Sequence, residues 1–249
     1  MCKPIKSYLT KIVRQIQIFR IFVQTLTNTF IMAKEKSKSY TEAELVKTFR
    51  LQNISTEESP KMQEWLAVEA PIFDIFEQHT FEVLFAKAAK NVRKWSEEDL
   101  KMKFISGILP LAYLEDSDRI LTFFEKTIFA TVEGHYLCTK SDFMVATGIF
   151  DMPEKPFFHF QEYKPHKKPS GDSMSQLLEA MLIAQHENAN EKPIYGCEII
   201  GKYWTFVILE GKSYCVSEGF DCTKKAVLLQ IISILRKFRH ILETELLDE

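Results

Sequence analysis

The sequence lacks the short motifs of several common enzyme classes. Its five cysteines form no Cys-x-x-Cys pair, and they form no cluster with the six histidines that has zinc-ligand spacing. It has no glycine-rich phosphate loop and no Gly-x-Ser-x-Gly sequence around a serine nucleophile. These absences argue against zinc modules, P-loop enzymes and hydrolases with a nucleophilic serine at such an elbow.

Long apolar runs and a strong net charge are also missing. No apolar run approaches the roughly 18 residues that a transmembrane helix needs, so we expect no membrane span. The formal net charge is −2, which limits any nucleic-acid contact to a local basic patch. Unpaired cysteines in strand-like runs are typical of reduced, buried thiols, so we expect a cytoplasmic protein.

Residues 1–31 differ from the rest of the chain. They contain lysine and arginine but no acidic residue, and polar residues interrupt their apolar runs. We expect residues 1–40 to be an N-terminal extension and linker outside the core. The alternative is a basic amphipathic helix that binds a membrane surface or a partner.

Helix signals dominate the chain up to about residue 110. Capping patterns and helical repeats of apolar residues mark the starts and the buried faces of these segments. The predicted helices are 41–51, 60–69, a longer one that Pro71 opens, and one from Ser96 that Gly107 and Pro110 end.

Aromatic and β-branched residues dominate the following part and predict strands interrupted by one helix. This order predicts an α/β fold with a mixed central sheet flanked by helices. We expect 41–92 to form a helical layer or a dimer surface, and 93–249 to form the core. The predicted strands are 120–130, 135–146, 157–164, 194–200, 203–209 and 213–217, with helices at 173–188 and from Thr223.

The stretch FFHFQEYKP, residues 157–165, ends an apolar run with charged residues. Side chains alternate along a strand, so Glu162 and Lys164 share one face and Tyr163 takes the other. The loop before this strand is centred near residues 151–152, and reflecting the chain about that centre places Asp142 opposite Glu162. Cross-strand partners lie about 5 Å apart at Cβ, so the two carboxylates are expected to be neighbours.

Two neighbouring carboxylates need a cation between them. Mg²⁺ or Mn²⁺ bound by Asp142 and Glu162, together with the backbone carbonyl of Tyr163, would meet that need with oxygen ligands. A metal-bound water near Lys164 could then attack a phosphodiester. The alternative is structural: Glu162 and Lys164 form an ion pair at the end of a strand.

These residues resemble a known family. The order helix, strand, Asp-bearing strand, Glu-x-Lys strand, helix and strand resembles the PD-(D/E)XK phosphodiesterase superfamily, which has the restriction-endonuclease-like αβββαβ core. Asp142 in SDFMVA matches the metal-binding aspartate, and Glu162 and Lys164 in QEYK match the (D/E)xK motif. Ser141 stands where many members have proline. The resemblance covers about residues 90–220 and points to the small stand-alone bacterial branch.

The resemblance implies further residues and a function. Glu97 in SEEDLKMKFI is similar to the acidic residue of the first core helix, and Gln176 in SMSQLLEAML to a glutamine that follows the motif. It implies a magnesium-dependent nuclease acting on nucleic acid, with DNA the expected substrate. Glu97 could instead complement a helix dipole, and Gln176 could be a solvent-facing residue.

A basic loop follows the motif. His166, Lys167 and Lys168 could hold substrate phosphates, or they could be a solvated loop. The near-neutral charge of the chain leaves a rival function open: a catalytically silent binding or regulatory module on the same fold.

Overall fold

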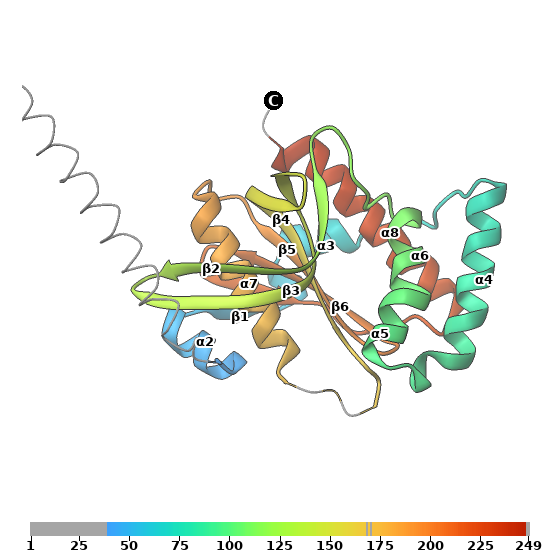
Figure 1. Cartoon of the computed structure of the whole chain (residues 1–249), viewed down its shortest axis with the longest axis horizontal. Helices are drawn as coiled ribbons and strands as arrows, with labels where there is room; N and C mark the ends of the chain where they lie inside the picture. Colours follow the sequence, from blue (N-terminus) through green and yellow to red (C-terminus); the bar gives the residue numbers. More distant parts are fainter. Residues whose placement is uncertain (1–38, 168, 170, 248–249) are drawn as a thin grey trace, which may run out of the picture. The chain divides into compact units, whose positions relative to one another are not determined.

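The computed structural model describes residues 39–167, 169 and 171–247 of the chain (Figure 1). The predicted N-terminal extension, residues 1–31, lies outside the described residues, and so does Lys168 of the basic loop. No helix within the described ranges is both long enough and apolar enough to cross a membrane.

Eight strands of the described chain form one mixed sheet, in the order β1-β7-β6-β5-β4-β3-β2, with β8 beside β6. The pairs β4–β5 and β1–β7 are parallel, and the other pairs are antiparallel. The strands are β1 (Gln52–Ile54), β2 (Leu121–Val132), β3 (His135–Ile149), β4 (Met152–Lys164), β5 (Ile194–Ile200), β6 (Tyr203–Glu210), β7 (Ser213–Val216) and β8 (Phe220–Asp221).

Helices flank this sheet, which confirms the predicted α/β class with a mixed sheet. Short helical turns lie at Thr56–Glu58, Val92–Lys94 and Leu242–Leu246. The longer helices are α2 (Glu42–Phe49), α3 (Pro60–Leu66), α4 (Ile75–Asn91), α5 (Glu97–Leu100), α6 (Ser106–Leu111), α7 (Ser173–Asn188) and α8 (Lys225–Ile241).

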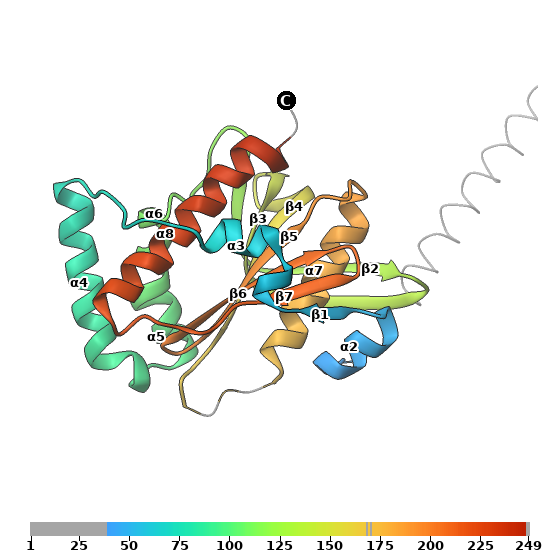
Figure 2. The ribbon, with the colours of Figure 1, turned by 180° about the vertical axis from the view of Figure 1, so that it is seen from behind.

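Each face of the sheet has its own apolar core. On one face α2 and α7 pack against the strands, with Leu45 and Leu177 fully buried. On the other face α3, α4, α6 and α8 pack, with Trp65 and Phe238 fully buried. Figure 2 shows α3 and α8 lying across the sheet on this second face. A strand between the two cores therefore sends alternate side chains into each of them.

Two of the predicted helix boundaries are wrong. Pro71 does not open a helix: α4 begins at Ile75, because the Asp74 carboxylate caps it by accepting the N–H groups of Phe76 and Glu77. Gly107 does not end the helix that starts at Ser96. A π-helical turn at Lys101–Ile105 joins α5 to α6 without a break.

The structure explains why a glycine stands at position 107 inside a helix. A Cβ atom there would lie 2.8 Å from a side-chain carbon of Leu84 in α4, so the glycine allows the two helices to approach. Pro110 lies in the last turn, and the helix ends one residue after it at Leu111.

The segment 41–92, predicted to be helical, also supplies the edge strand β1. Gln52 of β1 pairs with Ser213 of β7. Within this segment α2 joins the core beside α7, whereas α3 and α4 join the core beside α8. The segment is therefore part of the sheet and of both helical layers.

Candidate functional site

The hairpin of β3 and β4 brings Asp142 and Glu162 together. Phe143 pairs with Gln161, so the next pair along the two strands is Asp142 and Glu162, which is the predicted pairing. The turn is shorter than the expected loop, because β3 runs to Ile149 and β4 begins at Met152, and register shifts between Val145 and Thr147 produce the pairing. The ladder between the strands ends at Phe143. Beyond that last pair, a side-chain contact joins the two strands: the Asp142 Oδ2 atom accepts the backbone N–H of Tyr163 at 2.7 Å. The Asp142 carboxylate, in the middle of β3, is thus fixed beside the end of β4.

The Glu162 carboxyl group is buried and only partly satisfied. The residue is 1 % exposed, and its Oε1 atom has no hydrogen-bond partner among the described residues. Burial and the neighbouring Asp142 carboxylate together raise the pKa of Glu162 to about 9, although the Lys164 and Lys101 ammonium groups oppose the rise.

Lys164 reaches the same place from the end of β4. Its Nζ atom lies 3.9 Å from Glu162 Oε2, and its side chain is 9 % exposed. Two residues apart on one strand, the two side chains share a face, as the alternation predicts. The long distance makes this a loose ion pair. The structure thus brings Asp142, Glu162 and Lys164 together.

A second lysine, Lys101, completes the cluster, and sequence reasoning missed it. Its Nζ atom lies 2.9 Å from Glu97 Oε1, 2.7 Å from Glu125 Oε1 and 2.8 Å from Asp142 Oδ1. Burial alone would lower the pKa of Lys101, but the hydrogen bonds to the three carboxylates raise it. Lys101 is therefore a fully ionised ammonium held among carboxylates. The prediction that Glu97 belongs near the site fits this contact, which runs through Lys101.

Glu125 is the second residue that sequence reasoning missed. Phe124 pairs with Phe143 and Lys126 with Ser141, so Glu125 of β2 lies opposite Asp142. Burial would raise the pKa of Glu125, but the hydrogen bonds from Lys101 and Lys140 lower it to about 2. Reflecting the β2–β3 hairpin about its turn, as for β3–β4, would have found this residue.

The acidic residues continue across the sheet to β5. Glu162 pairs with Glu198 in the parallel register of β4 and β5. Burial raises the pKa of Glu198, whereas the hydroxyl of Ser173, the first residue of α7, donates to its carboxylate and opposes that rise. Adjacent positions on four strands, β2 to β5, therefore carry carboxylates.

The other predicted site residues lie around this cluster. Gln176 is half-buried in the first turns of α7, and no hydrogen bond joins it to Lys164 within the described chain. His166 follows β4 and lies against Gly201, at the turn between β5 and β6, and Lys167 is exposed. The structure thus places Glu97 in contact with the cluster and gives Gln176 no such contact.

The donor set fits a hard divalent cation. The two carboxylates and the Tyr163 carbonyl are oxygen ligands of the kind that Mg²⁺ and Mn²⁺ prefer, and the buried Glu162 Oε1 is an acceptor without a donor. In the described ranges, no three or more His, Cys, Asp or Glu side chains are grouped as a metal-binding set. A cation here would therefore be held by two carboxylates, with the carbonyl and water completing its shell.

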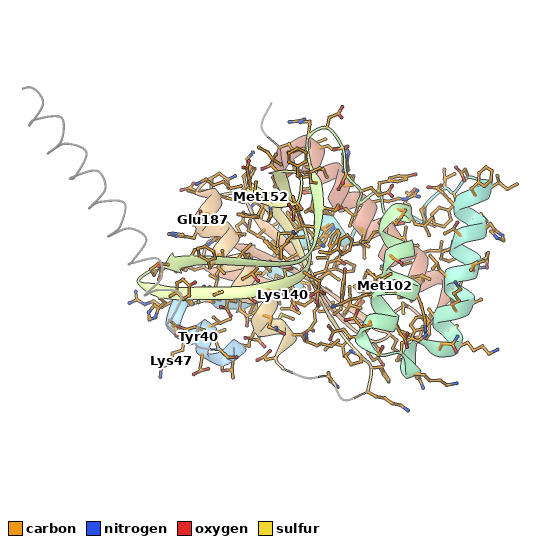
Figure 3. All side chains as sticks on the ribbon, in the orientation of Figure 1. Tyr40, Lys47, Met102, Lys140, Met152 and Glu187 are labelled. Atoms are coloured by element: carbon orange, nitrogen blue, oxygen red, sulfur yellow. The ribbon has the colours of Figure 1, made fainter. Side chains whose placement is uncertain are left out.

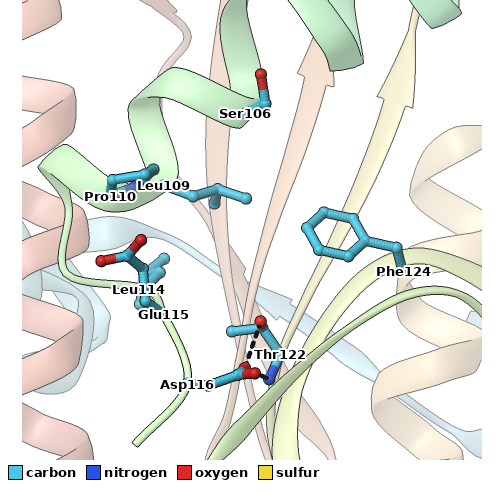
Figure 4. A pocket seen from close by; sticks show the side chains of 8 residues that line it. All are labelled: Ser106, Leu109, Pro110, Leu114, Glu115, Asp116, Thr122 and Phe124. Atoms are coloured by element: carbon cyan, nitrogen blue, oxygen red, sulfur yellow. Dashed lines mark hydrogen bonds between the residues drawn. The ribbon is translucent and has the colours of Figure 1, made fainter. Parts of the chain in front are cut away.

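A pocket of about 500 Å³ opens between α6 and the start of β2 (Figure 4). Phe124, the neighbour of Glu125 in the sequence, lines one side, and Ser106, in the same continuous helix as Lys101, lines the other. Glu115 and Asp116 add carboxylates to its lining. Asp116 Oδ1 accepts both the N–H and the hydroxyl of Thr122 at 2.7 Å, which fixes the start of β2.

No protein-family model matches this sequence, and no curated protein matches it. The geometry of the cluster is therefore the basis for any functional assignment.

Proposed function

We propose that this protein is a metal-dependent phosphodiester hydrolase that cleaves nucleic acid, with DNA as the expected substrate. One observation carries the proposal. A buried carboxylate oxygen without a partner, Glu162 Oε1, lies beside Asp142 and is accompanied by the Lys164 ammonium. Burying three ionisable groups together costs stability unless they serve a ligand or a reaction.

The order of elements supports the same proposal. The helix from α5 to α6 is followed by β2, β3 and β4, then by α7 and β5. This is the αβββαβ order of the restriction-endonuclease-like core that the sequence resembles. Asp142 lies on the second of these strands and Glu162 with Lys164 on the third, as the resemblance requires.

In this proposal Asp142 and Glu162 hold Mg²⁺ or Mn²⁺, and the Tyr163 carbonyl is the third ligand. The bound metal would supply positive charge to a phosphate and acidify a water molecule. The N–H of Tyr163 holds Asp142 in place at 2.7 Å, so this ligand is preorganised. Lys164 would position the attacking water beside Glu162.

The residues that follow β4 are the proposed substrate contacts. His166 and Lys167 come directly after the motif, and Lys167 is exposed to solvent, so both can approach a phosphate. Gln176, in the first turns of α7, would orient the substrate strand. Glu97 would support the site through Lys101.

The test is a cleavage assay. Full-length protein is incubated with plasmid, linear duplex, single-stranded DNA and RNA in Mg²⁺ or Mn²⁺, with a chelator as the blank. We expect metal-dependent cleavage that falls about 100-fold or more in Lys164→Ala. The matched control is Lys212→Ala, which removes a half-exposed lysine that pairs with Glu133 away from the cluster. Cleavage that persists undiminished in Lys164→Ala contradicts the proposal.

A specific observation favours one second candidate, a silent nucleic-acid-binding or regulatory module. Lys101 already forms ion pairs with Asp142, Glu97 and Glu125, so a cation is present in the cluster without a metal. This module would bind nucleic acid in gel-shift assays with chelator present and would cleave none of the four substrates.

A further inference from the structure

The Lys101 ammonium has a carboxylate partner for every one of its N–H donors. An ammonium has three N–H donors, and here each has one carboxylate within 2.9 Å: Glu97, Glu125 and Asp142. The Lys101 side chain is 14 % exposed. The ammonium therefore occupies the kind of oxygen cage that hard cations also prefer.

Both oxygen atoms of Asp142 already have partners. Oδ1 accepts from Lys101 and Oδ2 accepts from the Tyr163 N–H. A divalent cation that binds Asp142 must therefore share a carboxylate that already carries the Lys101 ammonium. Two cations at one carboxylate repel each other, so each weakens the binding of the other.

On the other side of Asp142, a buried acceptor has no donor. Glu162 Oε1 is without a partner in the described chain, and Glu162 is 1 % exposed. This oxygen, which Lys101 does not contact, marks where an incoming cation would bind. Lys101 and that cation would thus be neighbours at the same carboxylate.

We infer that Lys101 is an internal counter-ion that competes with the divalent cation for Asp142. Metal binding and release of the Lys101–Asp142 contact are then one coupled event, with Glu97 and Glu125 keeping the ammonium nearby. The inference rests on the proposed metal site, but it goes beyond that site. It makes Lys101 a positioning residue that sets metal affinity.

The experiment is a calorimetric titration of the full-length protein with Mg²⁺ and with Mn²⁺, for wild type, Lys101→Met and Lys101→Gln. Gln removes the charge but keeps two N–H donors for the carboxylates, so it serves if the Met variant folds poorly. The control is Lys103→Met, which removes an exposed ammonium paired with Asp99 on the same helix.

We expect both Lys101 variants to bind each metal at least about tenfold more tightly than wild type, and Lys103→Met to match wild type. The thermal midpoint should also rise more with added metal in the Lys101 variants than in wild type.

Equal affinity in wild type and both Lys101 variants would overturn the inference and leave the metal site standing. Binding in the variants alone would support the inference and contradict a metal-dependent wild-type nuclease. Binding in none of the proteins would overturn both the metal site and the inference.

Discussion

A buried carboxyl group away from the cluster, that of Glu179 in α7, gives the protein a predicted dependence of stability on pH. The residue is 5 % exposed, and its Oε1 atom accepts the N–H of Cys138 in β3 at 2.9 Å. Burial raises the pKa of Glu179 from an ordinary 4.5 to about 7, and the Cys138 N–H opposes the rise only in part.

Proton linkage gives the direction in which stability changes with pH. A carboxyl group with a raised pKa in the folded state keeps its proton on folding, so its full stability contribution is present below about pH 4.5. That contribution is lost as the pH rises through about 7. Each pKa unit is worth about 1.4 kcal/mol, and partial solvent screening reduces the total loss to about 2 kcal/mol.

Glu179→Gln removes the charge and keeps the oxygen that accepts the Cys138 N–H. We expect the variant to gain about 2 kcal/mol relative to wild type between about pH 5 and about pH 8. Urea unfolding followed by tryptophan fluorescence, with chelator present, measures this difference. Glu187→Gln, at a half-buried position of the same helix (Figure 3), is the matched control and should show the wild-type dependence. Parallel pH profiles for wild type and Glu179→Gln would refute the reasoning.

Two further predictions concern the stability of the fold. Gly201 and Gly211 have nearly the same positive φ, 59° and 58°, but a Cβ at Gly201 would lie 2.3 Å from the Cβ of His166, whereas nothing lies within 4 Å at Gly211. Gly201→Ala should therefore cost at least about 1 kcal/mol more than Gly211→Ala in urea unfolding, and equal costs would contradict the clash. Trp65→Ala removes a fully buried ring whose Nε1–H donates to the Ile234 carbonyl at 2.8 Å. It should cost about 3–5 kcal/mol in the same measurement, and a loss below about 1 kcal/mol would contradict this role.

The local part of the candidate site could be predicted from the sequence because its two strands are consecutive in the chain and form a hairpin. Strand composition located β3 and β4, and reflection about the expected loop paired Asp142 with Glu162. Reflection about the actual turn at residues 150–151 would have missed this pair, because register shifts between Val145 and Thr147 displace the pairing. Alternation along β4 then put Lys164 on the same face as Glu162. Each of these steps used only neighbouring parts of the chain.

The rest of the cluster depends on contacts between distant parts of the chain. Lys101 lies 24 residues from Glu125 and 41 residues from Asp142, and only the docking of the α5–α6 helix onto the sheet brings them together. No local pattern distinguishes this lysine from the exposed Lys103 nearby. A buried ion cluster of this kind is visible only once tertiary structure is known.

The fold likewise has parts that local sequence patterns predict and parts that depend on distant contacts. β1 has only three residues, which is too short for a periodic pattern that would predict a strand. Its partner β7 lies near the other end of the chain. The start of α4 is set by one capping side chain, Asp74, and not by the proline at position 71. Element type was predictable where apolar repeats are long, and boundaries were decided by single side chains.

The hydrogen bond from Trp65 to Ile234 joins residues 169 positions apart. Together with the pairing of β1 and β7, it means that an early part of the chain completes its core with late parts. During synthesis on the ribosome, Trp65 can complete its hydrogen bond to Ile234 only after α8 has emerged. Closing such long loops is entropically costly, and contacts so remote in sequence slow folding. Assembly of this domain is consequently expected to finish only once α8 is available to pack.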